Sequence, residues 1–166
     1  MNIELIKVEE EQREILAHLT ELYQYDFSEY DNQDVNSYGL YGYSYLDYYW
    51  TEPNRYAYFI KVDGKLAGFV MVCGFCYVSK EPGTLCMSEF FVLKKYRKQG
   101  IGKYAATKVL MMHPGKWELE VHPNNHGSHI FWYSVIQDVC KGKIQVVEHV
   151  EDVYDDALAT AYLFTV

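Results

Sequence analysis

The sequence predicts a single α/β domain built around a mixed sheet, and three observations support this fold class. The chain has 166 residues, which suffices for one domain with a sizeable core and falls short of two ordinary ones. Hydrophobic periodicity predicts helices that alternate with strands, and three of those strands are consecutive. No internal repeat or linker interrupts the pattern, so we expect one domain over residues 1–166.

The first half of the chain predicts a strand, a helix, a loop and three consecutive strands. Alternating residues at 3–8 indicate the first strand, and helical spacing indicates a helix from about 9 to 30. The Tyr-, Gly- and Asn-rich stretch at 31–50 is expected to be a loop with one helical turn, packed by its aromatic side chains. Asp63-Gly64, a favoured hairpin turn, separates the apolar strands predicted at 56–62 and 65–78, and a third buried strand follows at 84–93.

The second half predicts two helices among three further strands. Gly100 and Gly102 open a helix that runs to about Met112, with Ala105, Ala106, Val109 and Leu110 facing inward. The remaining elements are a strand at 116–121, a helix at 124–140 capped by Asn124 or Asn125, and strands at 143–150 and 159–166.

Composition excludes several classes of protein. No run of about 18 apolar residues is present, so no membrane association is expected, and the N-terminus lacks a signal-peptide pattern, which favours a cytoplasmic protein. A net charge of −8 argues against nucleic acid as a partner. The 4 cysteines lie in apolar surroundings and fit reduced core thiols better than a disulfide framework.

Charge is unevenly distributed along the chain. No Lys or Arg occurs between Arg13 and Arg55, whereas acidic residues are frequent there. Basic side chains instead gather in one short segment: Lys94, Lys95, Arg97, Lys98, Lys103 and Lys108. We therefore expect one basic spot and one acidic region.

The stretch "YRKQGIG" (96–102) at a strand-to-helix junction indicates an anion-binding site. Glycines remove Cβ atoms there, so successive backbone N–H groups can point at one ligand at a helix N-terminus. Arg97, Lys98 and Lys103 add positive potential, and a diphosphate is the expected guest. The stretch is not a phosphate loop ending in Gly-Lys-Ser/Thr, and it lacks the first glycine and the βαβ setting of a dinucleotide fingerprint.

Two motifs resemble the GNAT N-acetyltransferase superfamily. "VLKKYRKQGIG" (92–102) is similar to the acyl-CoA pyrophosphate loop of that family, and "NHGSHIFW" (125–132) is similar to its Asn-x-x-Ala-x-x-Phe-Tyr helix. Ser128 stands in the Ala place and Trp132 in the Tyr place. The resemblance covers essentially the whole chain and implies a sheet of about seven strands, flanked by about four helices, whose central strands splay apart.

The resemblance also implies acetyl-CoA as co-substrate, without a metal. The pantetheine arm would pair with the third central strand around Phe90, Phe91 and Val92, and the diphosphate would lie on the following loop near Arg97. Asn125 would reach the pantetheine amides. The implied cofactor-binding residues are Phe90, Phe91, Val92, Arg97, Lys98, Gln99, Gly100, Ile101, Gly102, Lys103, Asn125, Ser128 and Trp132.

Direct attack by an amine on the thioester needs a base. At pH 7 a lysine-like amine is neutral in only roughly one molecule in 2,500, so a nearby carboxylate must take a proton. Glu89 is the leading candidate, because it is the only acid on the central strand and precedes the cofactor-facing residues. Glu118 and Glu120 are alternates, since their two-residue spacing places both on one face of the adjacent strand.

The chain departs from the family where the leaving thiolate is protonated. Trp132 stands in place of the expected tyrosine, and an indole N–H is no acid at pH 7. Tyr133 is the adjacent candidate, although one residue turns a side chain by about 100° around a helix. The alternatives are another tyrosine from 38–49, or a thiolate that leaves without help.

Two spacings in the sequence resemble functional motifs, a metal site and a redox pair, but are better explained by structural roles. His122, His126 and His129 have metal-like spacings, but Pro123 separates the first from the helix of the other two, so no zinc site is expected. Cys73 and Cys76 have redox-motif spacing, but residues three apart in a strand point to opposite faces.

The sequence therefore predicts an acetyl-CoA-dependent N-acetyltransferase acting on a primary amine, either a small amine or a peptide or lysine amine. Tyrosines and acids in 31–50 favour a cationic acceptor through cation–π and Coulomb attraction. The alternative is a non-catalytic acyl-CoA-binding module with the same fold, and transfer of a longer acyl group is a third alternative. Exposed strands and aromatic surface favour a homodimer.

Overall fold

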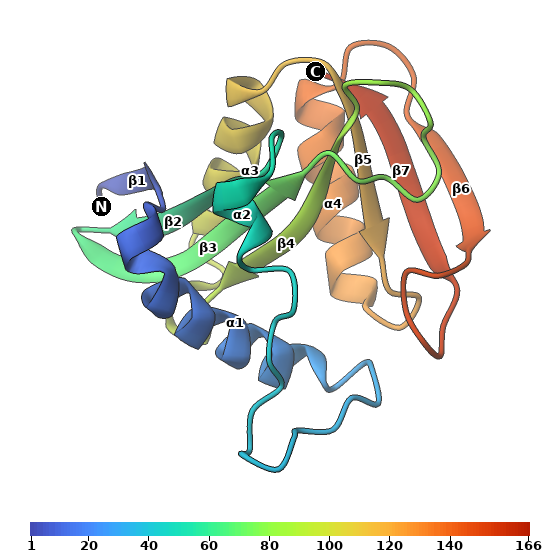
Figure 1. Cartoon of the computed structure of the whole chain (residues 1–166). Helices are drawn as coiled ribbons and strands as arrows, with labels where there is room; N and C mark the ends of the chain where they lie inside the picture. Colours follow the sequence, from blue (N-terminus) through green and yellow to red (C-terminus); the bar gives the residue numbers. More distant parts are fainter.

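The structure is a computed structural model that describes residues 1–166. It confirms the predicted fold class: one mixed sheet of seven strands in the order β1-β2-β3-β4-β5-β7-β6, with helices on both faces (Figure 1). The elements are β1 (Ile3–Lys7), α1 (Arg13–Phe27), α2 (Tyr48–Thr51), β2 (Tyr56–Val62), β3 (Lys65–Cys73), β4 (Leu85–Val92), α3 (Ile101–Met112), β5 (Lys116–Val121), α4 (His126–Val139), β6 (Gln145–Val150) and β7 (Ala159–Thr165).

Each face of the sheet carries its own apolar core. Helices α3 and α4 pack behind the sheet in Figure 1, where Ala105, Ala106, Val109 and Leu110 are fully buried as predicted. Helices α1 and α2 cover the front, where Leu16 and Tyr49 pack against apolar side chains of β2, β3 and β4. The sheet is therefore a wall between two cores, and a ligand that inserts into the sheet can be reached from both sides.

The strand predicted at 65–78 is shorter than expected, since β3 ends at Cys73. The next residues form a loop because a buried carboxylate binds their backbone. Glu118 accepts hydrogen bonds from the N–H groups of Tyr77 (2.6 Å), Val78 (3.0 Å) and Ser79 (2.6 Å). These donors are then unavailable for a strand ladder, and Cys76 lies in the loop rather than in the sheet.

The central strands splay apart, as the resemblance implies. Parallel strands β4 and β5 pair only at Leu85–Trp117 and Cys86–Glu118, after which they diverge (Figure 1). A register shift opposite Met71 and Val72 leaves Ser88 as an extra residue in β4, which is a β-bulge. The bulge places Ser88 and Glu89 on the same face of the sheet, where both bond tyrosines of the segment between α1 and β2.

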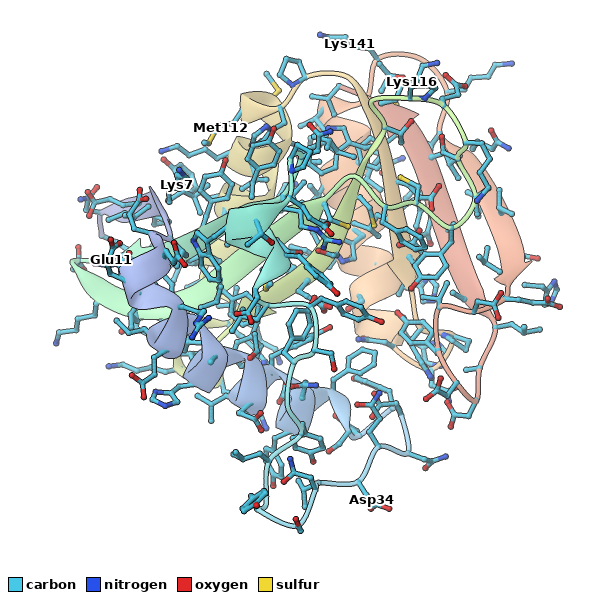
Figure 2. All side chains as sticks on the ribbon, in the orientation of Figure 1. Lys7, Glu11, Asp34, Met112, Lys116 and Lys141 are labelled. Carbon is cyan, nitrogen blue, oxygen red and sulfur yellow. The ribbon has the colours of Figure 1, made fainter.

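Two loops close the end of the molecule on which β4 and β5 splay. Asn32, after α1, donates a hydrogen bond to Asp156 on the β6–β7 loop at 2.7 Å. Asp34 lies at this end, whereas Lys116 and Lys141 lie at the opposite end (Figure 2). Acidic side chains thus gather at the closed end. Separately, none of the helices has the length and apolar character needed to cross a membrane.

Gly68→Ala is expected to destabilise the fold strongly. A Cβ at Gly68 in β3 would lie 2.0 Å from the carbonyl oxygen of Phe91 in β4, and backbone on both sides leaves little room to relax. We expect a loss of about 3 kcal/mol in the free energy of unfolding, measured by urea denaturation. Gly127→Ala is the control, because its Cβ would meet only Asn125 Oδ1 at 3.9 Å, in a helix where Ala is favoured. Equal stability of the two variants would contradict this packing.

Candidate active site

The loop between β4 and α3 presents free backbone N–H groups. Gly100 caps α3 with φ +79°, a left-handed conformation that glycine adopts readily, and Lys98 has φ +60°. No hydrogen bond within the chain uses the N–H groups from Lys98 to Lys103. Together with the N-terminus of α3, these donors form a cradle that suits an anion.

Arg97 fixes this loop to its neighbours. Its Nε donates to the carbonyl of Val92 at 2.7 Å, and its guanidinium bonds Asp26 of α1 at 2.6 Å, where Lys94 also binds at 3.1 Å. Burial alone would raise the pKa of Asp26, but Arg97 and Lys94 outweigh it and hold that pKa below its ordinary value. Arg97 is therefore engaged within the chain, and Lys103 is paired with Asp138 of α4 at 2.6 Å. Lys98 lines the cleft and forms no ion pair, so it carries the uncommitted charge nearest the cradle.

A cleft of about 590 Å³ runs from this loop to the point where β4 and β5 part. It brings together the predicted residues Phe90, Phe91, Val92, Arg97, Lys98, Gly100, Gly102, Lys103, Asn125, Ser128 and Trp132. Four other predicted residues do not line it. Gln99 is exposed, Ile101 is fully buried in the core, Tyr133 faces outward, and Glu89 lies just behind Ser88 and Phe90.

Helix α4 forms one wall of the cleft. Asn125 caps the helix, its Oδ1 accepting from the backbone N–H of Ser128 at 3.1 Å. Trp132 is 6% exposed and packs edge-on against Phe90, with ring centroids 5.0 Å apart. Tyr133 is 43% exposed and lies beside Tyr162, outside the cleft. The indole thus fills the wall position, and the adjacent tyrosine points away from it.

The carboxylate of Glu89 lies beside the hydroxyl groups of two tyrosines. Tyr43 donates to its Oε1 at 3.0 Å, and the hydroxyl of Tyr23 also supports its ionised form. Burial outweighs both tyrosines and raises the pKa of Glu89 to about 7. A group with this pKa exchanges protons readily at neutral pH.

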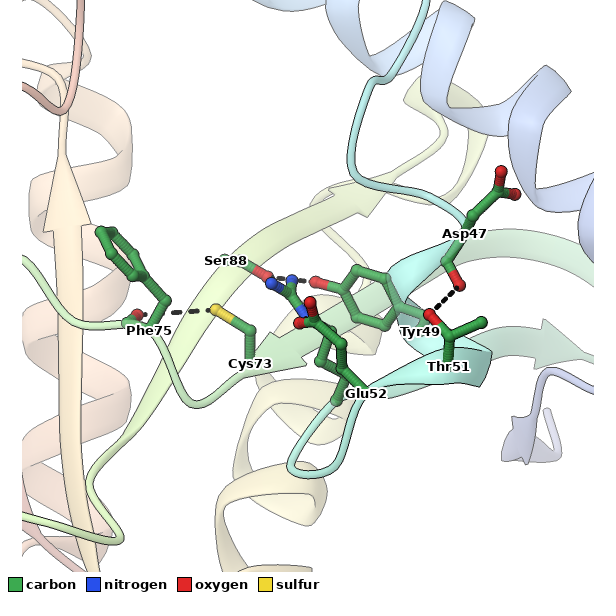
Figure 3. A network of polar contacts seen from close by, with 8 residues as sticks. Asp47, Tyr49, Thr51, Glu52, Cys73, Phe75 and Ser88 are labelled. Atoms are coloured by element: carbon green, nitrogen blue, oxygen red, sulfur yellow. Dashed lines mark hydrogen bonds and ion pairs between the residues drawn. The ribbon is translucent and has the colours of Figure 1, made fainter.

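The residue before Glu89, Ser88, belongs to a network of polar contacts with the segment between α1 and β2 (Figure 3). The hydroxyls of Tyr49 and Ser88 lie 2.7 Å apart, and Ser88 donates to the carbonyl of Met71 at 3.0 Å. The guanidinium of Arg55 lies over the rings of Tyr48 and Tyr49 and bonds Glu52 at 2.7 Å. These contacts hold the Tyr-rich segment at 31–50 against the bulge of β4. None of the residues of that segment lines the cleft itself.

The two carboxyl groups of β5 differ in environment. Burial would raise the pKa of Glu118, but its contact with Glu120 and the three loop N–H groups lower it, so Glu118 is ionised. Glu120 lines the cleft, and its pKa is raised to about 9 by burial and by the adjacent Glu118. Its Oε2 accepts from Cys86 Sγ at 3.3 Å, while Oε1 has no hydrogen-bond donor. Glu118 therefore binds the backbone of the β3–β4 loop, and of the two carboxyl groups only that of Glu120 lines the cleft.

The sequence analysis did not anticipate five aromatic or imidazole groups that line the cleft: Tyr23, Phe27, Tyr30, His122 and Tyr154. His122 is 1% exposed, and its Nδ1 accepts from the N–H of Asn124 at 3.2 Å, which places the proton on Nε2. That Nε2 has no partner in the chain. The only signal for His122 was its position at the end of a buried strand. Nothing in the acidic segment around Tyr154 marked it as a wall residue.

The three histidines do not converge. His129 Nδ1 lies 2.9 Å from the Tyr162 hydroxyl, and His122 packs against Tyr154 within the cleft. The cysteines are all free, with Cys73 opposite Cys86 rather than near Cys76 in the ladder.

Comparison with known proteins identifies the family. The acetyltransferase (GNAT) family model matches residues 14–134. The chain belongs to this family. It is accordingly an N-acetyltransferase, and the two motifs identified in the sequence lie within the matched residues. No curated protein sequence matches the chain.

Solved structures share the fold over nearly the whole chain. An acetyltransferase from Thermus thermophilus aligns with a TM-score of 0.72 at 14% identity, covering 100% of this chain and 98% of that one. The aminoglycoside acetyltransferase AAC(6')-Ib in complex with coenzyme A gives 0.70 at 12% identity, covering 99% and 95%. A spermidine N-acetyltransferase from Vibrio cholerae, in complex with CoA and spermine, gives 0.65 at 11%, covering 99% and 94%.

Tyr133→Phe is expected to leave most activity intact. The hydroxyl lies outside the cleft, so removing it changes neither the cradle nor the carboxyl groups. Steady-state kcat with any amine that is acetylated provides the measurement. A hundredfold fall in kcat would show that Tyr133 reaches the reacting atoms after all.

Proposed function

We propose that this acetyltransferase moves the acetyl group of acetyl-CoA to a primary amine, by direct attack of the amine in a ternary complex. The observation that carries the proposal is a single cleft with free backbone N–H groups at one end and, where two strands part, a carboxylate of pKa about 7 beside it. The first feature suits an anionic carrier, and the second suits proton removal from an amine.

Several groups of the chain fit acetyl-CoA, which supplies an activated acetyl thioester when bound. The N–H groups of Lys98 to Lys103 would hold the diphosphate, with the ammonium group of Lys98 adding charge. Beyond Cys86, β4 has no strand partner on the β5 side, so its backbone is open to the amides of the pantetheine arm. The unpartnered Nε2–H of His122 offers one more donor to a carbonyl in the cleft.

Glu89 is proposed as the base. Glu89 does not line the cleft, but the adjacent residue Ser88 does, so a water would complete the proton path from the cleft to Glu89. At pH 7 about half of a group with pKa about 7 is ionised and able to accept the amine proton. Tyr23 and Tyr43 hold the carboxylate in place in that state.

The surroundings favour a cationic acceptor. Tyr23, Tyr30 and Tyr154 line the cleft with aromatic surface. A second hollow of about 200 Å³ adjoins it at Tyr154 and is lined by Asp31, Asp155 and Asp156, among others. Carboxylates and aromatic faces attract ammonium groups. The structures of an aminoglycoside acetyltransferase and a spermidine N-acetyltransferase named above are of enzymes whose acceptors carry such groups.

One observation favours a second candidate, a module that binds acyl-CoA without catalysis. Trp132 occupies the α4 position from which a tyrosine would protonate the leaving thiolate, as the resemblance implies, and Tyr133 does not replace it. Such a module would keep the cradle of Lys98 to Lys103 and bind CoA, but would release no thiol in the presence of amines.

Glu89→Gln is expected to lower kcat by about 100-fold and to abolish the acidic limb of its pH profile. In the wild-type protein kcat should rise as pH increases through about 7, because Glu89 accepts a proton only when ionised. Glu11→Gln, an exposed change far from the cleft, is the matched control. An unchanged profile in Glu89→Gln would remove Glu89 from the base role.

The acceptor class is tested by CoA release from acetyl-CoA across polyamines, aminoglycosides, amino acids and N-terminal peptides. Mass spectrometry avoids interference from the 4 thiols of the protein. We expect kcat/KM to be highest for polyamines or aminoglycosides at low salt and to fall as salt screens the acidic wall. Equal values for cationic and neutral amines would contradict the cationic preference. Tight binding of acetyl-CoA with no release across the panel would favour the binding module.

A further inference from the structure

The transfer proposed above leaves one proton without a source. The amine loses a proton to Glu89, and the departing sulfur must gain one, since a CoA thiol is mostly protonated at pH 7. Trp132 is no acid, and Tyr133 is outside the cleft. A donor must therefore come from another element, and β5 offers one.

Glu120 lies near the point at which β4 and β5 stop pairing. Strands β4 and β5 stop pairing after Cys86 and Glu118, and the next cleft-lining side chains on each strand are Met87 and Ser88 on one side and Leu119 and Glu120 on the other. A pantetheine arm that begins at the diphosphate cradle and enters the splay would bring its sulfur to this point. Glu120 contacts Glu118 and Cys86 there, while its Oε1 is buried without a donor from the chain.

The surroundings of Glu120 contain several acids and no cation. The titratable groups that affect it or respond to it are Glu118 on β5, Cys86 on β4, Cys73 on β3, Cys76 and Tyr77 on the β3–β4 loop, and Tyr154 on the β6–β7 loop. Because Glu118 is held ionised by three backbone N–H groups, the proton of this carboxyl pair resides on Glu120. Glu120 is thus a neutral acid at neutral pH.

We propose that Glu120 is the acid of the transfer and protonates the sulfur of CoA as the carbon–sulfur bond breaks. The reacting nitrogen enters this step as a neutral amine, after its ammonium proton has passed to solvent. It bonds the acetyl carbon and releases one proton to Glu89. The electron pair of the broken bond stays on sulfur, which takes the proton of Glu120. The products are the amide and free CoA thiol, with Glu89 protonated and Glu120 ionised. One proton then passes from Glu89 to Glu120 through solvent before the next turnover.

Glu120 matches this task better than the tyrosines of the cleft. A donor works well when its pKa is close to that of the group it protonates. The pKa of about 9 for Glu120 is near that of a thiol, at about 8.5. Burial and the carboxyl groups of Glu89 and Glu120 raise the pKa of Tyr154 far above its ordinary value, and burial with Glu89 does the same to Tyr23. Both tyrosines therefore hold their protons too tightly.

The test that needs no acceptor compares two ligands by nuclear magnetic resonance. Glutamate side-chain carboxyl carbons are labelled with ¹³C, and the signal that titrates near pH 9 is followed with CoA and with desulfo-CoA bound. Both ligands occupy the diphosphate cradle, so only contact with sulfur distinguishes them. We expect the chemical shift and midpoint of Glu120 to differ between the two complexes. Identical titrations would overturn the proposal.

The kinetic test uses Glu120→Gln, which is neutral and nearly isosteric with the acid it replaces. We expect a fall in kcat of about 100-fold and loss of the alkaline limb near pH 9, with unchanged Kd for CoA and unchanged Tm. Glu148→Gln on β6, fully outside the cleft, is the matched control. Full activity and an unchanged alkaline limb in Glu120→Gln would overturn the assignment.

This inference rests on the proposed function, but the two fail separately. If wild-type protein acetylates no amine while the Glu120 signal still distinguishes CoA from desulfo-CoA, the contact between Glu120 and sulfur stands and the transfer is what fails. If amines are acetylated and the two ligands give the same Glu120 titration, the transfer stands and another group protonates the sulfur.

Discussion

The site depends on the point at which two parallel strands stop pairing. Strands β4 and β5 share only two register positions, Leu85–Trp117 and Cys86–Glu118. Beyond them the backbone of β4 faces a cleft instead of a strand, and buried backbone groups need partners. An extended ligand with amide groups would supply those partners. The same divergence exposes Ser88 and Glu120 across the gap, so a structural interruption of the sheet also brings polar side chains into its interior.

The buried carboxylate of Glu118 holds the β3–β4 loop against β5, next to the point where β4 and β5 stop pairing. Glu118 binds three consecutive N–H groups of the β3–β4 loop and is fully buried. Its charge is compensated by those donors, so its neighbour Glu120 carries the proton that both would otherwise share. Arg97 plays a comparable role at the other end, where its bonds to Val92 and Asp26 tie the cradle to β4 and α1. Charged groups in this protein therefore position its backbone.

Local patterns predicted most of the fold and the cofactor end of the site. The hairpin at 56–73 and the inward face of α3 follow from alternation, turn residues and helical spacing, which act over a few neighbouring residues. The glycine-rich loop was recognisable because its chemistry lies in one continuous stretch. The end of β3 at Cys73 was not, since it depends on a carboxylate about 40 positions away in the chain. The sequence was least able to predict the environment of individual side chains. Glu118 and Glu120 have equivalent positions in the alternating pattern of β5. They differ in charge because the β3–β4 loop donates hydrogen bonds to Glu118 and not to Glu120.

The position of Tyr154 has a consequence for how this enzyme could diversify. The family model covers residues 14–134, whereas Tyr154 and the β6–β7 loop lie outside it. The wall opposite the diphosphate cradle is thus built from a separate segment between two antiparallel strands, whose pairing fixes its ends but not its sequence. Such a segment can be exchanged as a unit while the loop between β4 and α3 stays intact, so under the proposed function a change in this segment would alter the acceptor and leave the binding of acetyl-CoA unchanged.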